Sequence, residues 1–265
     1  MKFPKLTTLL FSLATASLLF ASCDDDEDQP ATGSVDLEFE NVVGNQALTL
    51  NASTYYTTEA GDQFKVSKFN YFISNVKLTK SNGTTWAEPE SYHLVKQAEE
   101  NTHSFTLKDV PTGDYTQLTF TIGVDSTRNV SGAQTGALAQ NNDMYWSWSS
   151  GYIFLKMEGS SPQAANPGNL PNGGPLQFHI GGFRKPNNTV QTVSPSLPAS
   201  TALKVRGTVT PQVHLKADLN KMFAGPNTVR FATLAGTGHS SDPNSVKISQ
   251  NYAAGMFRID HIHAD

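Results

Sequence analysis

The sequence predicts an all-β protein: a single antiparallel β-sandwich of the immunoglobulin-like type, with long loops and a short C-terminal helix. Apolar and polar residues alternate with a period of two over many short segments, as they do in half-buried strands. Turn signals such as Asn82-Gly83 and Val110-Pro111-Thr112-Gly113 separate these segments. One sandwich is the simplest arrangement of so many strands in a mature chain of about 240 residues.

The strands, loops and helix of this sandwich can be placed along the chain. The first strand is expected at residues 35–40, where apolar and acidic residues alternate. Further strands are expected over residues 64–69, 71–79, 84–86, 92–95, 104–107, 116–124, 152–158, 176–180 and 202–215. Two polar stretches, 125–143 and 159–175, are predicted to be long loops. Residues 215–223 favour one or two helical turns, and near-helical spacing of apolar residues over 246–257 predicts the C-terminal helix.

Residues 1–22 have the features of a bacterial lipoprotein signal peptide. Lys2 and Lys5 provide a positive start, and residues 9–20 form an apolar stretch too short to span a bilayer. Small residues then precede Cys23, the only cysteine, at the position where a lipoprotein needs its lipidated thiol. An ordinary secretory leader with a chance cysteine is the alternative. We expect a lipid anchor in the bacterial outer membrane, with the domain periplasmic or surface-exposed.

The next segment, residues 23–33, is predicted to be an acidic disordered linker before a single domain at 34–265. The five acidic residues 24–28 are either a plain spacer or, as in Bacteroidota-like lipoproteins, a surface-export signal. Loss of the leader leaves 17 basic and 23 acidic residues, a net charge of −6, which argues against nucleic-acid binding. A single cysteine excludes an intramolecular disulfide and a cysteine-ligated zinc site in the folded part.

Residues 141–158 concentrate aromatic side chains, including two of the three tryptophans. On an extended backbone, Met144, Trp146 and Trp148 would point to one face of the strand. Two interpretations remain open at this point. The stretch is either the aromatic centre of a sandwich core, because such side chains bury large apolar areas, or the lining of a metal or ligand site.

Among the seven histidines, His261 and His263 form the most informative pair. On an extended backbone their imidazoles project from the same face and can chelate one metal ion. Asp260 beside them can orient an imidazole through its second ring nitrogen. His179, at a strand end, is a further candidate ligand, with a satisfied core histidine as the alternative. His214 is expected to point outward as a polar residue.

These residues allow a metal without choosing it. Imidazole suits copper, zinc, iron and nickel, whereas a thioether from Met144 or Met256 would favour Cu(I). Asp125, Asn129, Asn142 and Asp143 offer oxygen atoms that suit Ca²⁺, although their spacing matches no EF-hand and a solvated polar loop is the alternative.

Several ordered motifs resemble the MbnP-like family of copper-binding proteins. The resemblance covers roughly residues 34–263, nearly all of the mature chain. The segments that carry it are Ile122-Gly123-Val124-Asp125, residues 131–138 (SGAQTGAL), residues 144–156 (MYWSWSSGYIFLK), residues 178–183 (FHIGGF) and residues 256–263 (MFRIDHIH).

The resemblance implies a lipoprotein that binds one copper ion through histidines, for copper uptake or handling. It makes His179, His261 and His263 the expected ligands, with Trp146, Trp148, Met144 and Asp260 close by. In some members a tryptophan oxidised to kynurenine lies at the site, and Trp146 or Trp148 would match it here. Such oxidation requires a partner, in the family a di-haem peroxidase-like protein.

Two other functions remain open. A carbohydrate- or peptide-binding surface module would use Trp146, Trp148 and Tyr152 as an exposed stacking platform. A purely structural envelope lipoprotein would carry its histidines scattered over the surface. We expect no enzyme, because the sequence contains no nucleophile elbow, metalloprotease helix, P-loop or dinucleotide fingerprint.

Overall fold

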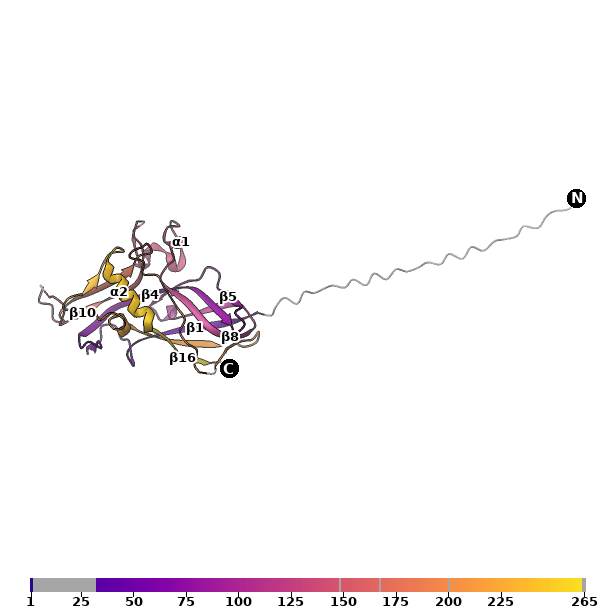
Figure 1. Cartoon of the computed structure of the whole chain (residues 1–265), viewed down its shortest axis with the longest axis horizontal. Helices are drawn as coiled ribbons and strands as arrows, with labels where there is room; N and C mark the ends of the chain where they lie inside the picture. The colour runs from indigo at the N-terminus through magenta and orange to yellow at the C-terminus, as the bar shows by residue number, and fades with distance from the viewer. Residues whose placement is uncertain (2–31, 148, 167, 200, 264–265) are drawn as a thin grey trace.

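The computed structural model describes residues 1, 32–147, 149–166, 168–199 and 201–263 (Figure 1). The predicted leader, the lipidation site Cys23, the acidic run and Trp148 lie outside the described residues. None of the helices within the described residues has the length and apolar character needed to cross a membrane.

Two sheets form the domain, and the predicted all-β sandwich is confirmed. A five-stranded sheet, here called the small sheet, runs β16-β14-β1-β2, and β7 also pairs with β1. Its strands are β1 (Thr32–Val43), β2 (Gln46–Ala47), β7 (Ser104–Pro111), β14 (Gln212–Asp218) and β16 (Phe257–His263). The other sheet, the large sheet, contains eleven strands. They are β3 (Tyr56–Thr57), β4 (Gln63–Lys80), β5 (Thr85–Ala87), β6 (Tyr92–Lys96), β8 (Gly113–Ile122), β9 (Tyr145–Ser147), β10 (Gly151–Ser161), β11 (Gly174–Gly181), β12 (Gln191–Val193), β13 (Leu203–Val205) and β15 (Gly236–Thr237).

Strand pairing is antiparallel with two exceptions. β1 pairs with β14 in parallel, and β11 pairs with β15 in parallel. Parallel neighbours need a long crossover between them, and here residues 44–211 separate β1 from β14. Because β14 also pairs with β16, the first and the last strands of the domain lie in one sheet.

The main core lies between the two sheets, as the alternation in β1 predicts. Val35, Leu37 and Phe39 are buried there, while Glu38 points to the outer face. The Phe39 ring packs edge-to-face against Tyr71, Phe120 and Phe257 at centroid distances of 6.3, 6.1 and 6.2 Å. Buried aromatic pairs of this kind add to the hydrophobic gain of the apolar area they remove from water.

A second apolar cluster covers the outer face of the large sheet, and it includes much of the aromatic stretch at 141–158. It contains Met144, Tyr152 and Phe154, packed with Phe72 and Leu138. The segment predicted as a long loop at 125–143 folds over this cluster. Three short helical segments occur within it: α1 (Ser126–Asn129), η2 (Gly136–Leu138) and η3 (Gln140–Asn142). Met144 and Tyr152 therefore belong to a core, as the first interpretation of the stretch states.

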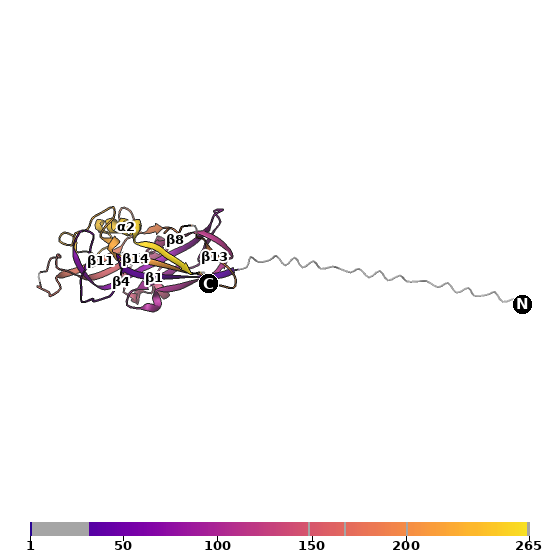
Figure 2. The ribbon, with the colours of Figure 1, turned by 90° about the horizontal axis from the view of Figure 1, so that it is seen from below.

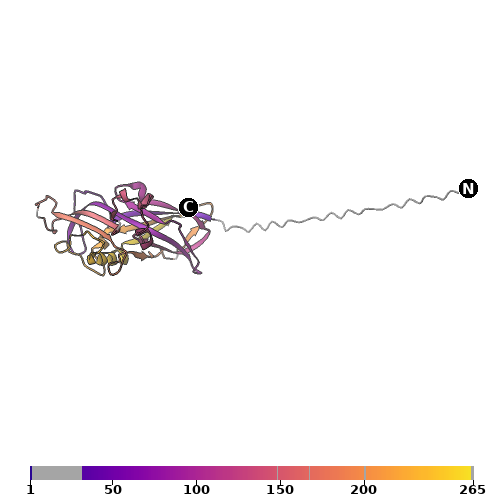
Figure 3. The same cartoon turned by 90° about the horizontal axis from the view of Figure 1, so that it is seen from above.

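The predicted helix near the C-terminus is α2 (Pro243–Gly255), and it is followed by strand β16. Asp242 caps it by accepting a hydrogen bond from the backbone N–H of Asn244 at 2.8 Å, and proline occupies the first turn. Tyr252 anchors it by donating to the Thr189 carbonyl at 3.0 Å. α2 lies along the outside of the strands (Figures 2 and 3). Short 3-10 turns η1 (Glu100–Thr102) and η4 (Leu219–Met222) complete the elements, the latter within the helical turns predicted at 215–223.

Candidate metal centre

Three histidines meet on the outer face of the small sheet. His214 comes from β14, and His261 and His263 come from β16, near the C-terminus in Figure 1. Each offers one ring nitrogen such that these atoms all lie within 4.8 Å of one another. The Nε2 atoms of His261 and His263 are 3.1 Å apart. The His214 ring lies 4.3 Å from that of His261 and 4.9 Å from that of His263, measured between centroids.

Strand register places these side chains together. β14 and β16 run antiparallel, with His214 opposite His261 and Gln212 opposite His263. Directly opposed residues on one face of an antiparallel pair have Cβ atoms about 5 Å apart. The parallel pairing of β1 with β14 adds Glu38 to the same row, beside His214. Val213 and Leu215 point into the core, so His214 must point outward.

A β-bulge in β16 turns the terminal histidines to this outer face. The register between β14 and β16 shifts after Leu215 pairs with Ile259, which leaves Asp260 as an extra residue. Phe257 and Ile259 are buried, and strict alternation from them would turn His261 and His263 inward. With the bulge, Asp260 and His261 are both exposed and Ile262 is turned inward. The position of the terminal histidines on this face therefore depends on one inserted residue.

Carboxylates hold the second nitrogen of two of the rings. Asp260 Oδ2 lies 2.9 Å from His261 Nδ1, and Glu38 Oε2 lies 3.3 Å from His214 Nδ1. An Nδ1–H donated to Asp260 leaves the Nε2 of His261 with a free lone pair, the form that binds metals. Hydrogen bonds with His261 and Lys216 lower the pKa of Asp260, so this carboxyl stays ionised. Burial lowers the pKa of His214, and the neighbouring His261 and His263 lower it further against the opposing effect of Glu38.

The geometry fits one metal ion after a small adjustment. With metal–nitrogen bonds of about 2.0 Å, two ligand atoms on a tetrahedral ion are separated by roughly 3.3 Å. The 3.1 Å between the Nε2 atoms of His261 and His263 is close to this value. The His214 ring stacks on that of His261 with only 15° between their planes, so it must turn to direct a nitrogen at the same ion. Rotation about χ2 of histidine is soft, and His214 is only partly buried.

Replacing Asp260 with asparagine should weaken metal binding about 10- to 100-fold without unfolding the protein. The amide removes the negative charge that favours the Nδ1–H form of His261 and strengthens its Nε2 as a ligand. Copper affinity measured by competition titration tests this expectation. Asp114→Asn is the matched control, because Asp114, on β8 of the large sheet, is also an exposed aspartate in an ion pair, with Arg206 as its partner. Equal copper affinity in both variants would show that Asp260 does not support the site.

His179 is not part of this cluster, which corrects the predicted ligand set. It lies on β11 of the large sheet, where its Nε2 is 2.9 Å from Glu158 Oε1. It pairs across the strands with Lys156, whose ammonium contacts Asp143 Oδ2 at 2.8 Å. Burial lowers the pKa of His179, while Glu158 opposes that effect. His179 therefore belongs to a charged network on the large sheet, and His214 replaces it beside the terminal pair.

Of the residues predicted to lie close to the metal, some are beside the three histidines and others are on the large sheet. Asp260 contacts His261, whereas Met144 is 1% exposed in the cluster over the large sheet. Met256 is fully buried in the main core. Trp146 is half-buried, and its ring lies so close to Gly181 that a Cβ there would come within 2.7 Å of it. Trp146 and Met144 thus accompany β10 and β11 rather than the three histidines.

The four residues considered for calcium each have a local partner in the structure. Asp125 caps α1 by accepting from the backbone N–H of Thr127 at 2.9 Å. Asn129 accepts from the backbone N–H of Tyr152 at 3.0 Å, and Asn142 donates to the Gly136 carbonyl at 2.9 Å. Asp143 pairs with Lys68 and Lys156. Each oxygen-bearing side chain therefore stabilises a local turn or an ion pair.

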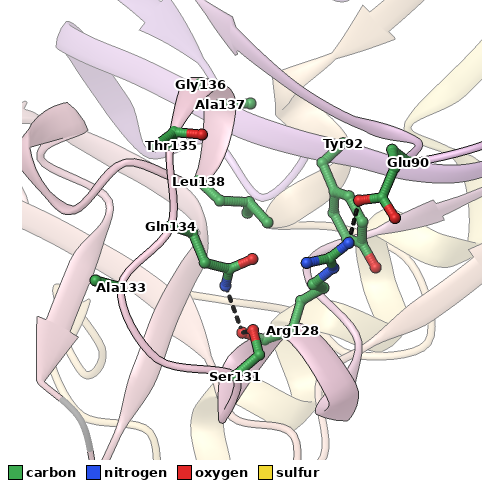
Figure 4. Close-up of a pocket in the computed structure, with 10 residues that line it drawn as sticks. All are labelled: Glu90, Tyr92, Arg128, Ser131, Ala133, Gln134, Thr135, Gly136, Ala137 and Leu138. Atoms are coloured by element: carbon green, nitrogen blue, oxygen red, sulfur yellow. Dashed lines mark hydrogen bonds and ion pairs between the residues drawn. The ribbon is translucent and has the colours of Figure 1, made fainter.

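A polar cavity of about 460 Å³ lies beside α1 and the loop that follows it (Figure 4). Arg128 forms an ion pair with Glu90 at this cavity and lies over the Tyr92 ring, 5.6 Å from its centroid. Tyr92 donates a hydrogen bond to Asp125, and burial together with this bond raises the pKa of its hydroxyl. The residues lining the cavity come from β6 and the turn before it, from α1, and from residues 131–138, so the cavity is separate from the three histidines.

Comparison with known proteins identifies the family. The family model for MbnP matches residues 32–245 of this chain, which is most of its length. The chain belongs to the MbnP family. Its fold is similar to the solved structure of MbnP from Methylosinus trichosporium, with a TM-score of 0.53 and 13% sequence identity over 88% of this chain and 99% of that one. No curated protein matches the chain.

Only some of the histidines of this MbnP-family protein lie in the region that the family model matches. His179 and His214 lie within it, whereas His261 and His263 lie beyond residue 245. The sequence signal for His214 was present, because the alternation of Val213, His214 and Leu215 already turned it outward. What the sequence did not show is which strand lies next to it, and that pairing is made by residues 257–263.

Proposed function

We propose that this MbnP-family protein binds one copper ion through His214, His261 and His263 for copper uptake or handling, and that it is not an enzyme. The observation that carries the proposal is the convergence of three imidazoles within 4.8 Å on one sheet face. The choice of copper is supported by membership of a family associated with that metal. Imidazole nitrogen is a good ligand for copper ions.

The chain's own residues explain how an ion would be taken up. With the Nδ1–H of His261 donated to Asp260, the Nε2–H of His263 can donate to the Nε2 of His261 across 3.1 Å, and a bound ion would displace that proton. Asp260 and Glu38 hold ring orientation through Nδ1. Both terminal histidines are exposed, so an ion would keep at least one position open to solvent. Such a site suits acquisition and transfer of a metal better than permanent structural storage.

Metal analysis of the protein purified without chelators tests this function. We expect about one copper ion per chain in the native protein and none above background in the His261→Ala/His263→Ala double variant, because a single imidazole cannot chelate. The control is His103→Ala/His239→Ala, which also removes two imidazoles but leaves the cluster intact. Unchanged copper content in the His261/His263 variant would contradict the proposal.

We also propose that Cys23 anchors the protein to the outer membrane through a lipid. Replacing Cys23 with serine should move the protein from the membrane fraction to the soluble fraction, since serine cannot form the thioether to the lipid. Cell fractionation with immunoblotting checks this outcome, and Ser22→Ala is the control for the adjacent position. A Cys23→Ser variant that stays in the membrane fraction would overturn the anchor.

The resemblance also implies a tryptophan oxidised by a di-haem peroxidase-like partner. Trp146 packs against Gly181 on the large sheet, so we do not place it among the ligands of the three-histidine site. Intact mass of the protein from its native host would show an oxidised tryptophan directly. The aromatic-platform function loses support for a different reason: Tyr152 is 1% exposed and donates to the Leu138 carbonyl at 2.6 Å.

A further inference from the structure

We propose that a pocket where β10 begins and β11 ends binds a small oxyanion: a phosphate or sulfate group that is either free or carried on a larger molecule. The pocket has a volume of about 240 Å³. None of its lining residues belongs to the small sheet, so the proposal is independent of the copper site and goes beyond the proposed function. Three segments line it: Ser149-Ser150, residues 182–187 and Ser240-Ser241.

Contacts between these segments hold the pocket open in one shape. A Cβ on Gly182 would come within 2.5 Å of the Ser240 carbonyl oxygen, so the two segments touch through their backbones. Asn187 Nδ2 donates to the Ser241 carbonyl at 2.7 Å and joins the same two segments again. The Phe183 ring packs against the second apolar cluster over the large sheet. A ligand that enters the pocket therefore has to order little of the chain around it.

The charge of the pocket is positive. Arg184 and Lys185 line it, no carboxylate does so within the described residues, and neither cation forms an ion pair there. The Arg184 guanidinium lies over the Phe183 ring, 4.7 Å from its centroid, and this contact positions it. In the cavity beside α1, by contrast, Arg128 is already paired with Glu90. A positive pocket in a chain of formal net charge −4 favours an anion as its occupant.

Hydrogen-bond donors suited to an anion surround the two cations. The hydroxyls of Ser150 and Ser240 have no partner among the described residues, and each can donate to an anion oxygen. The backbone N–H groups of Arg184 and Lys185 also have no acceptor in that part of the chain. Asp242, which follows the third segment, turns its carboxylate to the first turn of α2 and accepts a hydrogen bond there at 2.8 Å.

The size of the pocket sets the class of ligand. Pockets for drug-sized molecules usually exceed about 300 Å³, so this smaller one suits a compact oxyanion and leaves any attached group in solvent. Arg184 and Lys185 are both exposed, so an anion can reach them without a change of fold. The guanidinium fork matches two oxygens of a phosphate or sulfate group, and the ammonium adds a second charge.

Titration of the mature protein with inorganic phosphate and with sulfate, followed by two-dimensional NMR, tests the proposal. We expect saturable shifts of the backbone amide signals of residues 183–185. Binding should be about tenfold or more weaker in Arg184→Gln/Lys185→Gln, because two charge-assisted hydrogen bonds are removed. The control is Lys77→Gln/Lys204→Gln, which removes the same charge from two exposed lysines outside the pocket. Thermal unfolding shows that both variants remain folded.

Vesicles distinguish a free anion from one carried on a lipid. A Cys23→Ser chain, which carries no lipid, is sedimented with phosphatidylcholine vesicles that contain or lack phosphatidic acid. Binding that needs phosphatidic acid and is lost in Arg184→Gln/Lys185→Gln would assign the phosphate group to a lipid, whereas saturable binding of the inorganic anion alone would assign a free ion. No saturable binding in either experiment, or equal weakening by both double variants, would overturn the proposal. Copper content should be unchanged in both double variants, so this result is separate from a test of the copper site.

Discussion

Replacing His214 with alanine is expected to weaken copper binding about 100-fold, equivalent to about 2.7 kcal/mol, while replacing His179 leaves it unchanged. In the proposed site His214 is the only ligand on β14, and without it an ion would be held by two neighbouring imidazoles of one strand. His179 instead contacts Glu158 on the large sheet. Competition titration of the two single variants provides the comparison.

These two variants control for each other. Both remove a half-buried imidazole from a strand with a carboxylate partner, Glu38 in one case and Glu158 in the other. Their thermal unfolding should show that each remains folded. Loss of copper in His179→Ala with retention in His214→Ala would place the metal on the large sheet and contradict the site described above.

Replacing Phe39 with alanine is expected to destabilise the domain by about 4 kcal/mol. Its ring lies at the centre of the main core and packs against Tyr71, Phe120 and Phe257, so its removal leaves a cavity between the sheets. In a domain of this size each kcal/mol shifts the midpoint of thermal unfolding by about 2–4 °C, giving a fall of roughly 10 °C. Chemical and thermal unfolding measure the effect.

Leu170→Ala is the control for this loss of stability. Leu170 is 53% exposed, so its truncation should change the free energy of unfolding by less than about 0.5 kcal/mol. A loss below about 1 kcal/mol for Phe39→Ala would mean that the two sheets do not pack around this ring. The arrangement of β1 under the histidine face would then be wrong.

Local patterns in the sequence predicted most of the fold. The alternation in β1 gave the correct buried face, and the spacing of apolar residues gave α2 within a few residues. The stretches without periodicity are largely connections, although β10 and β11 take up the two ends of 159–175, and 125–143 contains α1 and covers a second core. These features depend on neighbours along the chain, which periodicity reports directly.

The cluster of three histidines could be predicted only in part, because it depends on contacts between distant strands. The pairing of His261 with His263 followed from their spacing, whereas His214 joins them through the register of β14 with β16. Nothing local favours that register over pairing with β11, which carries His179. The bulge at Asp260 is equally hard to predict from the sequence. Its trace in the sequence is the spacing of the inward-facing residues Phe257, Ile259 and Ile262, which is two and then three.

The aromatic stretch shows the opposite limitation. Its density of large side chains fits a ligand site and a core equally well, and only burial decides between them. Met144 and Tyr152 are each 1% exposed and support the loop that covers the large sheet. A family resemblance centred on such a motif therefore reports shared packing as well as any shared chemistry.

A crystal structure of the copper-loaded protein, with anomalous scattering recorded at the copper absorption edge, tests the central claim most directly. The account predicts one strong anomalous peak on the outer face of the small sheet, about 2 Å from a ring nitrogen of each of His214, His261 and His263. A peak beside His179 and Trp146 on the large sheet, with the terminal histidines unoccupied, would contradict it.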